Sequence, residues 1–218
     1  MKIYFISGLG ADRRAFQRIQ LPAGFDAVHV EWQPVRGGEG IEEYAAMLAS
    51  QIDPKEPFIL AGLSFGGIMA VEICKFLAPV KLLLFSTVRT RDQLPYSYRL
   101  AGYLQLHRLL PRQLLPFSLP YLYWFFGPLN AEGKLLVASF LRNTDYTYLK
   151  WALGQISRWK NTSLLDNTIH IHGEIDRAFP CRLVAADYVI PAAGHFCVFT
   201  HAGAVNAILK AELEPLLI

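Results

Sequence analysis

Short apolar segments recur along the chain at intervals typical of strands separated by helices. The segment at 58–61 is continuously apolar and the segment at 80–85 is apolar except for Lys81, which is typical of strands buried on both faces of a sheet. The remaining strands are predicted where apolar and β-branched side chains cluster between turn residues. Six strands are predicted, at Lys2–Ile6, Ala27–Trp32, Phe58–Ala61, Val80–Phe85, Thr168–Gly173 and Ala186–Ile190.

Helical periodicity appears between these strands. From residue 41 to residue 52, apolar side chains recur at the three- and four-residue spacing of a helix, and Glu42 and Glu43 lie near its positive end. This alternation predicts an α/β fold, with a mostly parallel sheet of about six strands and helices on both faces. Ligands of such folds bind at the carboxyl ends of the strands. Helices are predicted at Arg13–Ile19, Ile41–Ile52, Gly67–Leu77 and Ala202–Leu213.

The alternation stops between residues 89 and 161. This segment has helical periodicity, is divided by prolines and shows no strand alternation. We therefore predict a helical cap at 89–161, inserted between two parts of one core, residues 1–88 and 162–218. Its helices are expected at Tyr96–Leu110, Ala131–Leu141 and Asp145–Trp159.

Aromatic side chains are concentrated in this cap. Three interpretations are open: core packing of the cap, the lining of a pocket for an apolar acyl or aromatic group, and a membrane-surface patch. The cap also begins with an excess of arginine, with Asp92 as the single nearby carboxylate. These arginines form either a solvated face or a surface that attracts an anionic substrate tail. They are Arg89, Arg91, Arg99, Arg108 and Arg112.

Composition narrows the class of protein. Hydrophobic residues make up 53% of the 218 residues and charged ones 18%, which predicts a large core and no disorder. A net charge of +3, without a basic run interleaved with aromatics, argues against a nucleic-acid partner. Three widely spaced cysteines favour a reducing cytoplasm. The N-terminal apolar run is too short for a signal peptide, and prolines interrupt the lipophilic stretch at 114–126, so no stable membrane insertion is expected.

One serine lies at a predicted bend between a strand and a helix. Ser64 is at the centre of a G-x-S-x-G string, with Gly62 and Gly66 two residues away on either side. Small residues there would let the strand and the helix approach without a Cβ clash. The helix N-terminus would leave a partial positive charge beside the hydroxyl, which is useful where an anionic intermediate forms. The alternative is a glycine-rich turn that only packs a helix on a sheet.

With this nucleophile-elbow pattern the chain resembles an α/β-hydrolase, specifically a compact serine hydrolase with a helical cap. Two other motifs carry the resemblance, Ser7 to Gly10 after the first strand and the H-G-x-x-D string at 172–176. It implies that Ser64 is the nucleophile, Asp176 the acid and His195 the base, in the chain order that the fold requires.

The resemblance also assigns the oxyanion hole to the backbone N–H groups of Leu9 and Phe65. Ser7 departs from the family pattern, because histidine is common at that position, and this should change how the loop is braced. The short interval from Asp176 to His195 leaves room for a short helix or none.

Several alternatives to these assignments stay open. Asp92 and Asp166 are rival acids, His201 is a rival base, and His195 could be purely structural. The strand at 168–173 carries two histidines on one face, but no second cluster of ligands accompanies them, so no metal is expected.

The predicted function is that of a serine hydrolase. It would cleave a small or medium apolar ester or thioester through an acyl-enzyme intermediate, with a small-molecule substrate as its partner and without a cofactor. A sheet edge left exposed would allow a homodimer. The alternative is a non-catalytic or weakly catalytic protein that binds a small ligand on the same fold.

Overall fold

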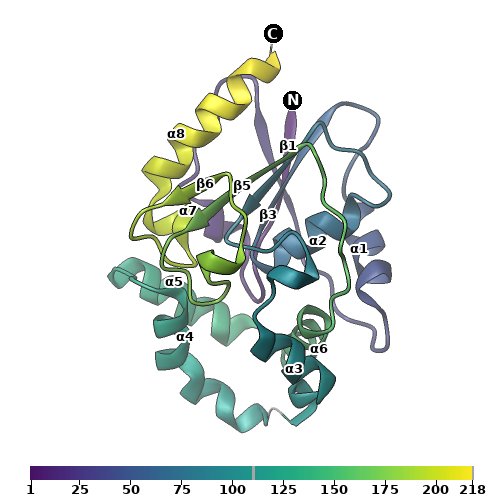
Figure 1. Ribbon diagram of the computed structural model, residues 1–218, viewed down its shortest axis with the longest axis vertical. Coiled ribbons are helices and arrows are strands. Elements are labelled where there is room, and N and C mark those ends of the chain that lie inside the picture. Colours follow the sequence, from purple (N-terminus) through teal and green to yellow (C-terminus); the bar gives the residue numbers. More distant parts are fainter. Residues whose placement is uncertain (110, 218) are drawn as a thin grey trace.

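Six parallel strands form one sheet in the order β2-β1-β3-β4-β5-β6 (Figure 1). The computed structural model describes residues 1–109 and 111–217, and for residues 114–116 the backbone alone. The predicted α/β fold class is therefore confirmed. The strands are β1 (Lys2–Ile6), β2 (Asp26–Val30), β3 (Phe58–Leu63), β4 (Lys81–Phe85), β5 (Thr168–Gly173) and β6 (Tyr188–Ile190).

The central strands consist mainly of apolar residues because both faces of the sheet are buried. Successive side chains point to opposite faces, so Leu82 and Leu84 belong to one core cluster and Leu83 and Phe85 to the other. The first cluster packs against α1 (Ile41–Ala49) and α2 (Phe65–Ile73). The second packs against α7 (Cys197–Thr200), α8 (Ala202–Leu213) and the 3-10 helix η1 (Arg13–Phe16).

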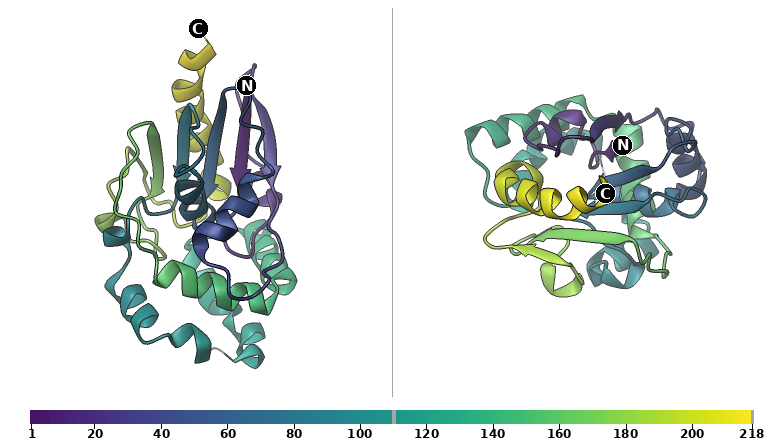
Figure 2. Two further views of the ribbon diagram at one scale, coloured as in Figure 1. Left: turned by 90° about the vertical axis from the view of Figure 1, so that its right-hand side faces the viewer. Right: turned by 90° about the horizontal axis from the view of Figure 1, so that it is seen from above.

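The segment between β4 and β5 contains helices and, among its described residues, no strand. In Figures 1 and 2 these helices lie at the end of the molecule opposite both termini. Asn130 and Asp145 cap the two longest, because their side chains accept from Gly133 N and Tyr148 N. The helices are α3 (Tyr96–Tyr103), η3 (Leu106–Leu109), η4 (Arg112–Ser118), α4 (Leu119–Phe126), α5 (Ala131–Asn143) and α6 (Tyr146–Ser157).

Some predicted boundaries were wrong. The strand predicted to end at Ala61 continues to Leu63, and the next helix begins at Phe65. Only a short 3-10 helix forms where Arg13–Ile19 was predicted. The helix predicted from Tyr96 ends at Tyr103, and its predicted last residue, Leu110, lies outside the described residues.

Two absences bear on the predictions. Between Asp176 and His195 the only helix is the three-residue η5 (Cys181–Leu183), as the short interval predicted. Among the described residues, no helix is both long and apolar enough to cross a membrane.

The division into a core at 1–88 and 162–218 and a cap at 89–161 remains a proposal. The word "cap" below refers to residues 89–161.

Candidate active site

Ser64 occupies a strained bend between β3 and α2. Its φ of 55° and ψ of −120° lie in a region that residues with a side chain rarely adopt. The bend is held because Ser64 N donates to Phe85 O at 2.9 Å and Thr87 Oγ1 donates to Ser64 O at 2.7 Å. Its hydroxyl consequently projects beyond the carboxyl end of the strand.

The glycines beside Ser64 are required by close backbone contacts. A Cβ at Gly62 would lie 2.5 Å from Gly66 O, and one at Gly66 would lie 2.3 Å from the carbonyl oxygens of Ile6 and Ser7. No side chain fits at those distances. The glycines therefore bring β1, β3 and α2 together beneath the serine.

The three side chains predicted to act together do meet. His195 Nε2 lies 2.8 Å from Ser64 Oγ, and His195 Nδ1 lies 2.8 Å from Asp176 Oδ2. Because an ionised carboxylate only accepts hydrogen bonds, Nδ1 carries the proton and Nε2 accepts from the serine hydroxyl. Asp176 and His195 are buried. This geometry can remove a proton from Ser64 and hold it on the imidazole.

The loops that carry Asp176 and His195 are joined through their backbones. Ile175 N donates to Ala193 O at 2.9 Å, and Glu174 N donates to Ile190 O at 3.0 Å. His195 N in turn donates to Phe126 O of the cap at 3.0 Å. Three phenylalanine rings surround the imidazole, with centroids within 6.1 Å, namely Phe125, Phe126 and Phe179. The histidine is thus fixed from the sheet side and from the cap side.

Asp176 is held by donors on both of its oxygens. Oδ1 accepts from Ala178 N at 2.8 Å and from Phe179 N at 3.0 Å. On the other side His172 Nε2 lies 3.4 Å from Oδ2 and 2.7 Å from Phe179 O. Because a carbonyl only accepts, Nε2 carries the proton of a neutral His172.

A second histidine lies behind His172. The second histidine is His170. The Nδ1 atom of His172, which is unprotonated in this tautomer, accepts a hydrogen bond from His170 Nε2 at 3.3 Å. Burial lowers the pKa of His172, against the attraction of Asp176, and burial lowers the pKa of His170 well below its ordinary value. The histidines that raised the question of a metal site thus support the carboxylate, and no group of three potential ligands occurs among the described residues.

The loop after β1 lies directly against the serine. An ideal Cβ at Gly8 would lie 3.4 Å from Ser64 Cβ, and Leu9 borders the same cavity as Ser64. Ser7, in place of the common histidine, braces this loop by donating to Ala11 O at 2.7 Å and accepting from Trp32 Nε1 at 2.9 Å. Phe65 begins α2, where backbone N–H groups have no acceptor within the helix.

A cavity of about 480 Å³ opens from Ser64 and His195 into the cap. Its lining is apolar and aromatic and includes no aspartate, glutamate, lysine or arginine among the described residues. The aromatic side chains of the cap divide among the cavity lining, core packing and the exposed surface. Tyr98 and Phe125 line the cavity, Trp151 packs against Tyr44, and Tyr103 is exposed.

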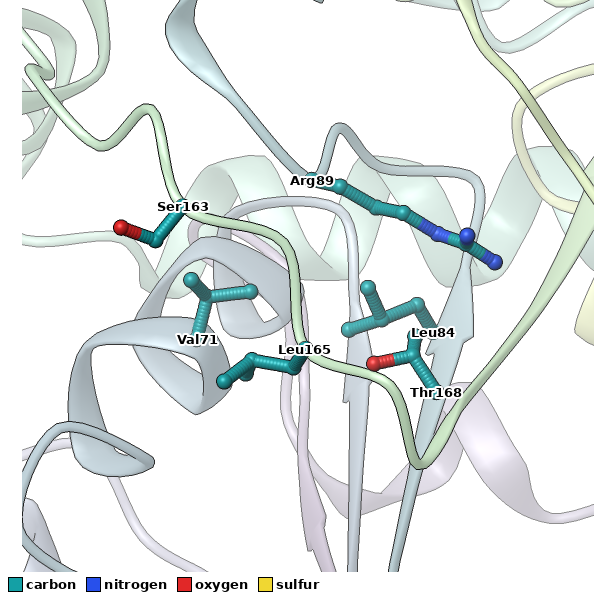
Figure 3. A pocket seen from close by; sticks show the side chains of 6 residues that line it. All are labelled: Val71, Leu84, Arg89, Ser163, Leu165 and Thr168. Atoms are coloured by element: carbon teal, nitrogen blue, oxygen red, sulfur yellow. The ribbon is translucent and has the colours of Figure 1, made fainter.

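The rival residues lie elsewhere. Asp92 pairs with Arg99 on the surface, Asp166 precedes β5 at the opposite end of the sheet, and His201 contacts Thr200. Arg89 pairs with Asp187. Figure 3 shows Arg89 in a separate hollow, which is too small to hold a water molecule and is lined by Val71, Leu84, Arg89, Ser163, Leu165 and Thr168.

Sequence reasoning missed the residues that support the site. Trp32 stacks on Phe65 with ring centroids 5.4 Å apart, Thr87 holds the serine backbone, and His172 contacts the carboxylate. Two of them had a detectable signal, because Trp32 and Thr87 closely follow the carboxyl ends of β2 and β4.

The comparison with protein families is decisive for classification. A sequence model described as "Alpha/beta hydrolase family" matches residues 3–208. The chain belongs to this family. The resemblance and the predicted enzyme class are thereby confirmed, whereas a search of curated proteins finds no match.

Solved structures of α/β-hydrolases share the fold. A thermophilic esterase from Thermogutta terrifontis, with malate bound, has a TM-score of 0.76 at 16% identity, over 99% of this chain and 90% of that one. A hydrolase from Pseudomonas aeruginosa PA01 has a TM-score of 0.75 at 14% identity, over 97% and 89%. The RedJ thioesterase of the prodiginine pathway in Streptomyces coelicolor has a TM-score of 0.68 at 17% identity, over 98% and 90%. At these identities the likeness concerns the fold.

Proposed function

We propose that this α/β-hydrolase is a serine hydrolase that cleaves a small or medium apolar ester or thioester. The observation that carries the proposal is the chain of two 2.8 Å contacts from Ser64 through His195 to Asp176, at the mouth of an apolar cavity. Esterases and a thioesterase among the structures of similar fold support the same class of reaction.

The reaction proceeds in two halves. His195 Nε2 takes the hydroxyl proton while Ser64 Oγ attacks the carbonyl carbon, and Asp176 stabilises the imidazolium. The oxyanion is bound by the backbone N–H groups of Leu9 and Phe65, each typically worth about 3 kcal/mol in the transition state. The imidazolium then protonates the leaving alcohol or thiol. Water, deprotonated by His195, releases the acid and restores Ser64 without a cofactor or metal.

The cavity supports a neutral, apolar acyl group. Its volume of about 480 Å³ leaves room for roughly 16 water-sized groups at about 30 Å³ each. A carboxylate or phosphate buried there would meet no lysine or arginine among the described lining residues. Medium acyl chains therefore match it better than charged acids.

The environment of the cysteines supports the predicted cytoplasmic location. Cys74, Cys181 and Cys197 are free thiols. Burial raises the pKa of Cys197 to about 12, which keeps it protonated and inert. A homodimer through a sheet edge remains a prediction.

A panel of chromogenic esters and acyl thioesters of increasing chain length, with Ser64→Ala as the blank, tests this function. We expect hydrolysis that depends on Ser64 and favours uncharged chains. His195→Ala and Asp176→Asn should lower kcat/KM at least about 10³-fold, with little change in the thermal unfolding midpoint. Wild-type rates in either variant would refute the role of that residue. Ligand binding without Ser64-dependent turnover would favour the alternative of a binding protein.

A further inference from the structure

The outer edge of the cap combines apolar exposure with positive charge. We define the outer cap edge as residues 103–109, 111–113 and 117, which carry several large apolar side chains exposed to solvent. Tyr103 is 85% exposed, Phe117 78% and Leu109 75%. Large apolar side chains usually cluster on a surface where a partner protein, a ligand or a membrane binds to them. Leu104 and Leu106 complete the set.

Cations flank these apolar side chains. Between residues 93 and 131 the sequence contains no aspartate or glutamate. None of the ion pairs among the described residues involves Arg108, Arg112, Lys150 or Arg158. Lys150 Nζ donates to Arg108 O at 2.9 Å, which brings α6 to this edge.

His107 reports on the charge at the centre of this edge. Burial lowers its pKa, and the neighbouring Arg158, Arg108 and Lys150 lower it further. An ideal Cβ at Gly154 would lie 2.8 Å from His107 Nε2 and 3.3 Å from Arg158 NH2, so both side chains cross the same turn of α6. The local potential is therefore positive.

We propose that the outer cap edge docks on an anionic lipid surface. Apolar side chains enter the boundary between headgroups and acyl chains, while arginine and lysine meet the anionic headgroups. A second copy of the chain would fit less well, because the same cations would face one another across a symmetric interface. The edge lies at the end of the molecule opposite both termini (Figure 1), so the core would face away from the lipid.

Docking at this edge would bring the lipid phase next to the cavity. His107 and Ser118 belong to the outer cap edge or directly follow it, and both line the cavity that begins at Ser64. An acyl chain could then pass from the lipid into the cavity without crossing water. Only this last step rests on the proposed hydrolase function.

Sedimentation of the full chain with vesicles tests the docking. Wild type and Ser64→Ala should both bind vesicles of phosphatidylglycerol and phosphatidylcholine, bind pure phosphatidylcholine much more weakly, and dissociate as salt is raised. Arg108→Gln with Arg112→Gln should weaken binding about fivefold per arginine. Tyr103→Ser with Leu109→Ser should weaken it about tenfold or more.

Matched variants at the other end of the molecule control for general loss of charge or apolar surface. Lys2→Gln with Lys55→Gln, and Phe76→Ser with Leu164→Ser, should bind like wild type. Equal loss in these controls would overturn the proposal, as would equal binding to neutral and anionic vesicles.

Other outcomes separate docking from catalysis. One such outcome is a wild-type protein that fails to bind vesicles and forms a dimer that the Tyr103→Ser with Leu109→Ser variant does not form. That result would overturn the proposal of a lipid surface and identify a second copy of the chain as the partner. Vesicle binding without hydrolysis of any ester would support docking and refute the hydrolase function. Ser64-dependent hydrolysis without vesicle binding would support the hydrolase function and refute docking.

Discussion

At the scale of single residues, the carboxylate of Asp176 accepts hydrogen bonds on both of its oxygens. Two backbone N–H groups donate to Oδ1 and His195 Nδ1 donates to Oδ2, while His172 Nε2 donates to Phe179 O and lies 3.4 Å from Oδ2. A carboxylate fixed in this way can orient one tautomer of His195. We infer that His172 is a positioning residue, since it does not line the cavity.

Replacing His172 with phenylalanine keeps a ring but removes its N–H donor. We expect kcat to fall about tenfold or more, the change that about 1.4 kcal/mol of lost orientation produces. KM should stay the same. The acidic limb of the pH–rate profile should shift to lower pH, because a displaced carboxylate stabilises the imidazolium less. Steady-state kinetics over pH provide the measurement.

His172→Gln retains a donor and should recover part of the rate. His201→Phe, which changes a histidine outside the site, should match wild type. A His172→Phe variant with wild-type kcat would remove the positioning role, and equal losses in the phenylalanine and glutamine variants would reduce it to packing.

At the scale of elements, the nucleophile depends on how closely β1, β3 and α2 approach. Gly66→Ala would place a Cβ 2.3 Å from the backbone oxygens of Ile6, the last residue of β1, and of Ser7. Because backbone cannot yield as a side chain does, we expect a loss of about 3 kcal/mol or more in the free energy of unfolding. Urea denaturation measures this change.

Gly203→Ala is the matched control. No atom lies within 4 Å of an ideal Cβ at this position in α8. Alanine should therefore raise stability by up to about 1 kcal/mol. A Gly66→Ala variant as stable as Gly203→Ala would show that the three elements are not locked together.

The helices and strands also show how much of the fold the sequence predicts. The strands and the three motifs were predictable because each depends on local patterns of apolar residues and glycine. The end of β3 was not, because Leu63 pairs with Phe85 on β4 and this pairing overrides the turn tendency of Gly62. The break after Tyr103 follows from a positive φ of 53° at Gln105, where no glycine or proline marks it.

Parts of the candidate site lay beyond prediction for a similar reason. Helical periodicity identifies the apolar face of a cap helix but not the element that it meets. The wall of the cavity brings together Leu9, Tyr98, Leu153 and Phe196, which are distant in sequence. The contact of His172 with Asp176 depends on how the loop after β5 folds back over its own strand.

At the scale of the whole molecule, two buried neutral histidines tie stability to pH. Burial lowers the pKa of His170 and His172 below their ordinary value of 6.5, so the unfolded state binds more protons once the pH falls below that value. The free energy of unfolding should therefore fall below about pH 6.5, by up to about 1.4 kcal/mol per pH unit for each histidine. Urea denaturation at several pH values tests this.

The double variant His170→Gln with His172→Gln should flatten that dependence. His29→Gln is a milder control, because burial lowers the pKa of His29 at a more exposed site. A slope that is unchanged in the double variant would assign the acid sensitivity to other groups.

The proposed function depends on Ser64 acting as the nucleophile. Covalent labelling of Ser64 tests this claim most directly. Folded wild-type protein should react with a fluorophosphonate probe and gain one adduct, located at Ser64 by peptide mass spectrometry, while Ser64→Ala should gain none. Folded wild-type protein that remains unlabelled, or a Ser64→Ala variant labelled to the same extent, would contradict the proposed nucleophile.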